Sequence, residues 1–420
     1  MIRFNPTLAK VIAVAATSLL ILSGCSSAPA AAPTTAPAAA TKAPVAAPTT
    51  AAPGAAPTTA APAVAPTTAA PGAAPTTAAA AAPKAATGKI ALLLPETKTT
   101  RYETADRPFF EAKFKQLAPG VDIIYSNANQ DANTQLSQFE AALANGAKVV
   151  VLDPVDSKAA GAMADKAKAQ GVSIIAYDRL ILNSDGVSYY ISFDNAKVGQ
   201  LQAQSLVTRL GQLNMPNPQI VMINGAPTDN NASLFKQGAH SVFDPMVADK
   251  KLTIAKEYDT PDWSPDQAQN EMQQSLTALA NKVDGVYAAN DGTGGGAIAA
   301  MKAAGLSPLP PVTGQDAELA GIQRILKGDQ YMTVYKAIKP EAEAAAQLAY
   351  DLLTNAPVPA DMTQGKTVAN GTVDVKSVLL TPVAVTKDNV KDTVVMDGFW
   401  TAQQICTPDM ADSCKAAGLQ

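Results

Sequence analysis

The sequence Val172-Ser173-Ile174-Ile175-Ala176-Tyr177-Asp178-Arg179 decides the fold, because an apolar run ends there in a carboxylate and a guanidinium. A continuous apolar run of this length is typical of a strand that is covered on both faces, as strands are in a parallel sheet. A helical pattern over residues 159–169 ends at Gly171, directly before it. In open α/β sheets, ligands bind just beyond the carboxyl ends of the strands. Asp178 and Arg179 are therefore candidate ligand-binding residues.

The same alternation of strand and helix continues on both sides of this stretch. It indicates parallel sheets covered by helices, which is a doubly wound α/β architecture. About 300 residues in this pattern exceed one comfortable hydrophobic core, so we expect two lobes. The pattern predicts strands at residues 90–94, 121–125, 149–152, 172–177, 220–223, 252–255, 285–288 and 332–335, and helices near 110–117, 131–146, 159–169, 198–210, 232–243, 265–280 and 294–303.

Polar residues also follow several of the other predicted strands. Asn290, Asp316 and Lys336 each come just after an apolar run, Asn231 follows the strand at 220–223, and Arg101 lies beyond the first strand. Aspartate accepts a hydrogen bond from a hydroxyl, arginine and lysine donate one, and asparagine does both. A set of this kind suits a sugar.

Two aromatic residues are candidates for a plate against the apolar C–H faces of a sugar ring. Trp263 follows Thr260-Pro261-Asp262, which we expect to be an exposed loop, and Tyr102 comes directly after Arg101. Trp263 could instead be a core residue of the second lobe.

Each polar candidate also has a purely structural interpretation. Asp178 and Arg179 could form a surface ion pair, and Lys336 could be solvated. The remaining candidates could cap the helices that follow them: Asn231 with its neighbours Asp229 and Asn230, Asn290 with Asp291, and Asp316.

Composition argues against several other functions. The net charge of −4 gives no basic patch for nucleic acid, and one histidine with three cysteines does not suit a metal site or a histidine-based catalytic triad. No phosphate-binding glycine motif followed by lysine is present, so we expect no nucleotide and no cofactor. A glycosidase needs one carboxyl group with a raised pKa, whereas Arg179 and Lys336 should lower the pKa of Asp178 and Asp316. We therefore expect a binding protein with no catalytic residues.

The first 88 residues differ from the rest. Arg3 and Lys10 precede an apolar run over 11–22, which is typical of a secretory signal peptide covering residues 1–24. Leu22-Ser23-Gly24-Cys25 resembles the lipobox of bacterial lipoproteins, which implies acylation of Cys25; the alternative is an ordinary signal with a chance cysteine. Residues 25–88 are almost entirely Ala, Pro, Thr and Gly, so we expect a disordered, extended tether, plain or O-glycosylated.

Segments spread over residues 89–400 match a known protein family, in the same order along the chain. They resemble the D-xylose-binding group of the type I periplasmic sugar-binding proteins, which serve ABC importers and include ribose- and galactose-binding relatives. The segments that carry this resemblance are Ala176-Tyr177-Asp178-Arg179, Tyr190-Ile191-Ser192-Phe193-Asp194-Asn195, Lys197-Val198-Gly199, Asp229-Asn230-Asn231-Ala232, Asn290-Asp291, Gly314-Gln315-Asp316-Ala317, Leu319-Ala320-Gly321-Ile322 and Thr333-Val334-Tyr335-Lys336.

The resemblance implies two lobes joined by three hinge crossings that close on a monosaccharide. Lobe 1 would comprise residues 89–193 and 337–378, and lobe 2 residues 194–336 and 379–400. The implied pocket takes Arg101, Asp178 and Arg179 from lobe 1, Asn231, Asn290 and Asp316 from lobe 2, Lys336 at a crossing, Trp263 as the stacking plate, and Tyr102 in place of a tryptophan.

D-xylose is the ligand that the resemblance favours, although Tyr102 and the unusual segment Pro95-Glu96-Thr97-Lys98 leave other pentoses or hexoses open. The implied partners are an ABC importer permease with its ATPase, and the bilayer through the acyl chains on Cys25, with the protein acting as a monomer on the outer face of the cell membrane. The alternative role is a sugar sensor that docks on a membrane receptor or kinase.

Residues 401–420 lie beyond the resemblance and are expected to be a C-terminal tail. Cys406 and Cys414 lie close together there, and outside the cytoplasm two such cysteines are expected to form a disulfide, with free thiols as the alternative.

Overall fold

The computed structural model describes residues 86–420. The expected signal peptide, Cys25 and nearly all of the Ala/Pro/Thr-rich segment lie outside the described residues. Between residues 86 and 420, strands and helices alternate as predicted, and the two main sheets are mostly parallel.

The first sheet has seven strands in the order β10-β11-β5-β4-β3-β1-β2. Neighbours run parallel except for β10 and β11, which are antiparallel. We call this sheet with its helices lobe 1. Its strands are β1 (Lys89–Leu94), β2 (Asp122–Asn127), β3 (Ala147–Leu152), β4 (Ser173–Tyr177), β5 (Val187–Phe193), β10 (Thr367–Ala369) and β11 (Asp374–Leu380).

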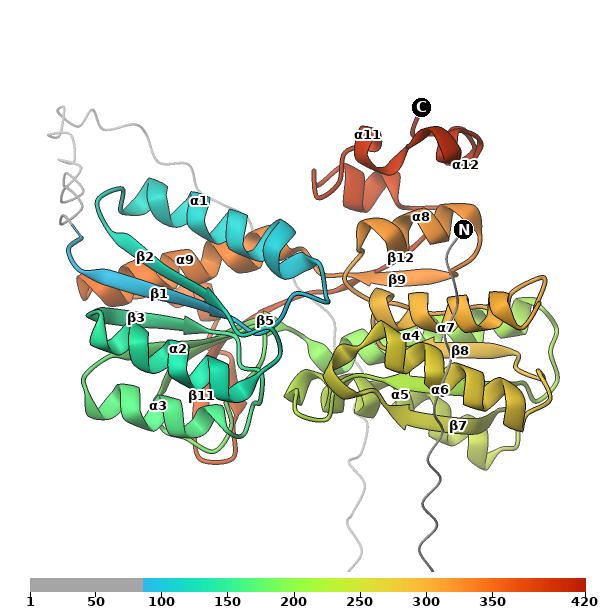
Figure 1. Cartoon of the computed structure of the whole chain (residues 1–420), viewed down its shortest axis with the longest axis horizontal. Coiled ribbons are helices and arrows are strands. Elements are labelled where there is room, and N and C mark those ends of the chain that lie inside the picture. The colour runs from blue at the N-terminus through green and yellow to red at the C-terminus, as the bar shows by residue number, and fades with distance from the viewer. Residues whose placement is uncertain (1–85) are drawn as a thin grey trace, which may run out of the picture. The chain divides into compact units, whose positions relative to one another are not determined.

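Helices cover both faces of this sheet (Figure 1). Alternate residues of β1 point to opposite faces, so Ile90 and Leu92 pack with α1 (Arg107–Leu117) and α9 (Ile338–Thr354), whereas Ala91 and Leu93 pack with α2 (Ala132–Ala144) and α3 (Ala160–Ala169). This two-sided burial explains why the strands read as continuous apolar runs in the sequence.

The second sheet has the order β7-β6-β8 and is parallel, formed by β6 (Gln219–Asn224), β7 (Thr253–Asp259) and β8 (Gly285–Ala288). The antiparallel pair β9 (Met332–Tyr335) and β12 (Val383–Thr386) extends it through the bridge between Val286 and Val312 and the bridge between Gln315 and Val334. We call this group lobe 2. Its two faces pack against α4 (Asn195–Gln212) with α5 (Asn230–Ala248), and against α6 (Pro265–Ala278) with α7 (Asp291–Ala303).

Side-chain caps begin several of these helices. Asp131, Asp194, Asp229 and Ser264 accept hydrogen bonds from the first backbone N–H groups of α2, α4, α5 and α6. Asn290 begins α7 with a reciprocal capping box to Thr293. Each cap satisfies backbone donors that have no partner inside the helix.

Between residues 86 and 420 the chain passes between the two lobes three times. The passages lie between β5 and α4, between β9 and α9, and between β11 and β12. The second passage contains Lys336, which places this side chain where the two lobes meet.

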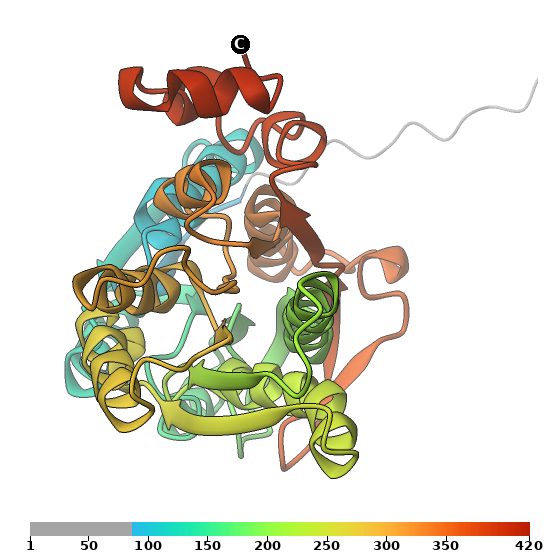
Figure 2. The ribbon, with the colours of Figure 1, turned by 90° about the vertical axis from the view of Figure 1, so that its right-hand side faces the viewer.

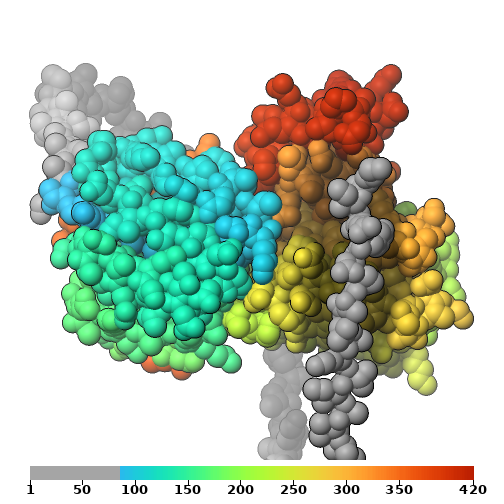
Figure 3. All heavy atoms as spheres, viewed as in Figure 1, coloured from blue at the N-terminus to red at the C-terminus, as the bar shows by residue number. Residues whose placement is uncertain are grey.

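Several elements were not predicted, including α9, β10, β11 and β12 as well as β5. Strand β5 is not among the predicted strands, because Ser188, Tyr189 and Ser192 interrupt the apolar pattern. The C-terminal residues, expected to be a tail, form α11 (Ala402–Ile405) and α12 (Ala411–Ala416) and pack against α8 (Leu319–Lys327). Figures 2 and 3 show these residues (red) lying against lobe 2.

Candidate functional site

A small polar cavity of about 20 Å³ lies where the ends of the strands of both lobes meet. All nine predicted ligand-binding residues line it, and their role in binding stays a prediction. Four further residues that were not predicted also line it. The lining consists of Thr99, Arg101, Tyr102, Asp178 and Arg179 from lobe 1, Asp229, Asn231, Phe235, Trp263, Asn290, Gln315 and Asp316 from lobe 2, and Lys336.

Arg101 is held so that one edge of its guanidinium faces the cavity. It lies directly after the loop that follows β1, and Asp106 accepts hydrogen bonds from its Nε at 2.9 Å and its Nη2 at 2.6 Å. Glu341 of α9 also accepts from Nη2, at 3.0 Å. Nη1 then lies 3.3 Å from Asp178 and 3.7 Å from Asp316, a carboxylate of the other lobe.

Asp178 lies next to two cations and a tyrosine hydroxyl. Besides Arg101, Lys336 lies 3.5 Å from its Oδ1, and the Tyr102 hydroxyl donates to Oδ2 at 3.3 Å. Burial by itself would raise the pKa of Asp178, but Arg101, Lys336 and Arg179 outweigh it and lower the pKa to about 2. Asp178 is therefore an ionised acceptor at neutral pH, as the sequence predicts, and is unsuited to act as a general acid.

Arg179 is fully buried and spans the junction of the lobes. Its Nε lies 3.0 Å from Asp229 of lobe 2 and 3.5 Å from Asp153 of lobe 1, and its Nη2 donates to the Tyr102 hydroxyl at 3.1 Å. The interpretation of Asp178 and Arg179 as a surface ion pair is wrong, because both are buried and Arg179 pairs with other carboxylates.

Asp153 and Asp229 flank the guanidinium of Arg179. Burial raises the pKa of both carboxyl groups, and Arg179 is the strongest influence that opposes this rise. Asp153 directly follows β3, so the rule that identified Asp178 could also have identified it.

Asp316 and Lys336 form a second charged pair, with Lys336 Nζ 3.1 Å from Asp316 Oδ1. Burial alone would lower the pKa of Lys336, but Asp178 and Asp316 raise it above its usual value, so the ammonium stays charged. The alternative of a solvated lysine is wrong, since Lys336 is only 2% exposed.

Asn231 and Asn290 each combine a structural contact with a place in the cavity lining. The Asn231 amide donates to the backbone oxygen of Asp178 at 3.0 Å, across the two lobes, and accepts from Asn195 at 2.8 Å. The cap at the start of α5 is Asp229. Asn290 caps α7, as its structural interpretation predicts, which occupies its side-chain oxygen.

Trp263 packs into the core of lobe 2 and also lines the cavity. Its ring meets Phe235 edge-on at 6.3 Å, and its Nε1 donates to Asp229 at 3.1 Å. The expected exposed loop before it is only partly exposed, because Thr260 is buried. Gly225 makes room for the indole: a Cβ there would lie 2.0 Å from the ring, so even alanine would displace Trp263.

Three of these side chains extend from backbone in the left-handed region. The φ angles of Asp178, Trp263 and Asp316 are 53°, 54° and 87°. Such conformations are sparsely populated by residues other than glycine and persist where the surroundings hold them in place. The left-handed backbone at these three positions therefore directs their side chains toward the cavity.

Contacts between the rims of the two lobes surround the cavity. Glu318, directly after the Asp316 loop, accepts from the Thr100 backbone N–H at 3.0 Å, and Asn230 N–H donates to Ser157 Oγ at 3.1 Å. Burial, with the nearby Asp291, raises the pKa of Glu318 to about 8. Glu318 is thus largely protonated at neutral pH and can contact the other lobe without a buried charge.

The arrangement is suited to holding a polyhydroxylated molecule. Buried cations, carboxylates and amides converge on one cavity, with aromatic rings beside them. Charge-assisted hydrogen bonds are the stronger kind and fix the orientation of hydroxyl groups. In the part of the chain that the structure describes, no three His, Cys, Asp or Glu residues cluster so as to hold a metal ion.

A second, wider hollow lies at the other end of lobe 2. Apolar and proline residues such as Leu306, Pro308 and Leu309 line it together with Tyr331. None of the predicted ligand-binding residues is found there, and none of its charged residues is buried.

Comparisons with known proteins agree with this geometry. The family model described as "Periplasmic binding protein domain" matches residues 90–357. The chain is 40% identical over 311 residues to the D-xylose-binding periplasmic protein of Escherichia coli, covering 74% of this chain and 90% of that protein. It is 34% identical to a multiple sugar-binding periplasmic receptor of Rhizobium radiobacter, covering 78% of this chain and 94% of the receptor.

Solved structures show the same relationship. An ABC transporter solute-binding protein from Clostridium phytofermentans with bound β-D-glucose has a TM-score of 0.69 and 31% identity, covering 76% of this chain and 100% of that one. A carbohydrate transporter solute-binding protein from Chloroflexus aurantiacus, in complex with D-glucose, also has a TM-score of 0.69 and 31% identity, covering 76% of this chain and 98% of that one. Within residues 86–420, no helix has the length and apolar character needed to cross a membrane.

Proposed function

This chain belongs to the periplasmic binding protein family. We propose that it is an extracytoplasmic receptor that binds a monosaccharide, with D-xylose as the expected ligand, and delivers it to an ABC importer. The observation that carries the proposal is the buried set of Arg101, Asp178, Asp316 and Lys336, which the two lobes bring together. The D-xylose-binding relatives support the choice of sugar.

Sugar hydroxyls would take over contacts that the charged side chains make with one another. A hydroxyl can donate to Asp178 or Asp316 while it accepts from Arg101 or Lys336, so each ion keeps a charged partner. Trp263 and Tyr102 would supply the flat apolar surface that the C–H faces of the ring require.

Closure of the lobes would make the site selective. Both lobes supply contacts, so the full set forms only when the rims meet. A sugar that lacks one hydroxyl leaves a buried polar group unpaired, at a cost of about 1–3 kcal/mol, which weakens binding roughly tenfold to a hundredfold.

A titration of the protein with several monosaccharides tests the proposal. Calorimetry with xylose, ribose, arabinose, glucose and galactose is expected to give one-site binding, tightest for xylose, and the emission of Trp263 is expected to change on binding. If no monosaccharide binds, the proposed function is wrong. If glucose or another hexose binds more tightly than xylose, sugar binding stands and the xylose assignment fails.

We also propose that the protein is a lipoprotein anchored through Cys25 on the outer face of the membrane. The lipobox-like Leu22-Ser23-Gly24-Cys25 after an apolar run supports this, because acylation of the cysteine would anchor the chain. Labelled palmitate is expected to enter the parent protein and not the Cys25→Ser variant. A variant that still fractionates with membranes as the parent does would contradict the anchor.

A further inference from the structure

We infer that Trp400, carried by a disulfide-closed C-terminal cap, is a positioning residue that holds the Asp316 loop in its ligand-binding shape. We define the C-terminal cap as residues 399–420. The inference rests on the proposed function, since it concerns the affinity of the site that contains Asp316.

The loop 316–318 is held at each of its backbone positions. Asp316 and Ala317 both have left-handed backbone, with φ of 87° and 48°. Asp316 N–H donates to Val334 O at 2.9 Å, Ala317 N–H to Thr333 Oγ1 at 3.2 Å, and Glu318 N–H to Asp291 Oδ2 at 2.9 Å. These three contacts come from within lobe 2 and satisfy the N–H groups.

The carbonyl oxygen of Ala317, in contrast, is contacted by the C-terminal cap. Trp400 Nε1 donates to Ala317 O at 2.8 Å. Alanine has no side chain to stabilise left-handed backbone, so contacts to its N–H and C=O must hold it there. Trp400 therefore supplies the contact that fixes the carbonyl directly after Asp316.

The C-terminal cap also packs next to the residue that precedes Lys336. Phe399 packs against Tyr335, the residue before Lys336, with ring centroids 5.3 Å apart, and against Trp400 at the same separation. The two aromatic residues of the cap thus lie behind both Asp316 and Lys336, which face each other across 3.1 Å.

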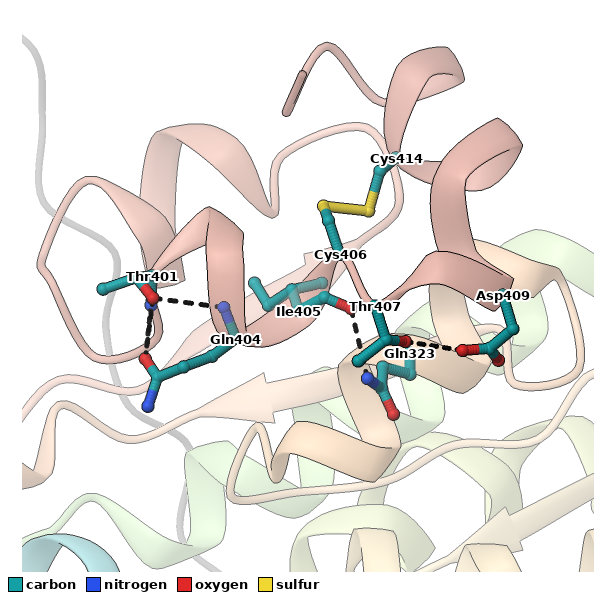
Figure 4. The surroundings of a disulfide bond; sticks show 8 residues. All are labelled: Gln323, Thr401, Gln404, Ile405, Cys406, Thr407, Asp409 and Cys414. Atoms are coloured by element: carbon teal, nitrogen blue, oxygen red, sulfur yellow. Dashed lines mark hydrogen bonds between the residues drawn. A yellow bond between two sulfur atoms is a disulfide. The ribbon is translucent and has the colours of Figure 1, made fainter.

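The C-terminal cap is fixed to lobe 2 by buried side chains and closed by a disulfide. Ile405, Met410 and Cys414 are fully buried against α8, and Cys406 and Cys414 form a disulfide (Figure 4). Gln323 of α8 donates to the Ile405 backbone oxygen at 3.1 Å, a contact that Figure 4 also shows. This docking contact lies on α8 and not on the loop, so it provides a matched control.

Ligand affinity should depend on how firmly the loop is held before the sugar arrives. If Ala317 relaxes toward ordinary backbone, Asp316 turns away from Lys336 and must be reordered on binding. A site that is ordered only on binding binds more weakly than a preorganised one.

The test compares Trp400→Phe, which keeps an aromatic ring but removes the donor, with Gln323→Ala. Calorimetry with D-xylose on the full chain is expected to show a dissociation constant about threefold to tenfold higher for Trp400→Phe, the loss typical of one hydrogen bond. Gln323→Ala is expected to bind within about twofold of the parent, within the error of such comparisons. Trp400→Phe with the parent's affinity, or an equal loss in both variants, would overturn the inference.

A spectroscopic measurement separates positioning from general stability. The chain has two tryptophans, so subtracting the emission of Trp400→Phe from that of the parent isolates the emission of Trp400. This emission is expected to change little when calorimetry shows D-xylose bound, because the Asp316 loop is already held in its ligand-binding shape. A large shift on binding would contradict the inference, since the sugar would then have to reorder the loop. Failure of the parent to bind any monosaccharide would defeat the proposed function, and this inference with it.

Discussion

Replacing Asp316 with asparagine is expected to weaken monosaccharide binding about a hundredfold, because a charge-assisted hydrogen bond to the sugar, worth about 1.5–3 kcal/mol, is lost. The substitution also removes one of the two carboxylates that face the Lys336 ammonium, which is buried. Asparagine keeps the size of the side chain, so the effect reports charge and not shape. Calorimetry with the sugar that the parent binds gives the ratio of dissociation constants.

Asp249→Asn is the matched control for this substitution. Asp249 pairs with Lys251 on the surface, where its side chain is 61% exposed, and such pairs contribute about 1 kcal/mol or less. The control is expected to bind like the parent. If Asp316→Asn also binds like the parent while the melting temperatures agree, Asp316 is not a ligand-binding residue and the assigned site is wrong.

Replacing Arg179 with methionine is expected to lower the free energy of unfolding by about 3–5 kcal/mol and to abolish measurable sugar binding. Methionine fills much of the space but leaves Asp153 and Asp229 buried without their cation. Arg107→Met is the control, because Arg107 makes surface pairs with Glu103 and Glu111 and is 39% exposed. Urea unfolding measures both variants.

The loss of stability in Arg179→Met should depend on pH in a definite direction. Burial raises the pKa of Asp153 and Asp229, and the variant lacks the guanidinium that opposes this. Above about pH 4, the usual pKa of aspartate, the folded variant then binds more protons than its unfolded chain, so its stability falls as pH rises. The deficit relative to the parent is expected to be smaller at pH 5 than at pH 8. A parent-like stability at both values would contradict the account.

The sequence predicts the α/β architecture well because buried parallel strands are continuous apolar runs. The rule that ligands bind beyond strand ends, together with the family resemblance, leads to residues such as Asp178 and Lys336, all of which line one cavity. Strand β5 was not predicted, because its polar residues interrupt the apolar pattern. The strength of the local pattern thus decides which elements can be predicted.

The residues that support the site are harder to predict. Glu341 contacts Arg101 from 240 positions away along the chain, on a helix whose pattern says only that it is amphipathic. Trp400 contacts Ala317 across 83 positions, from a bend that precedes α11 and carries no periodic signal. Such contacts depend on tertiary packing, which one sequence does not reveal.

The most direct test of the central claim is a crystal structure of the protein with D-xylose. The account predicts one sugar between the two lobes, with its hydroxyls within hydrogen-bonding distance of Asp316, Asp178 and Lys336 and its ring against Trp263. A sugar bound in the hollow lined by Leu306, Leu309 and Tyr331 at the other end of lobe 2, with the cavity between the lobes unchanged, would contradict it.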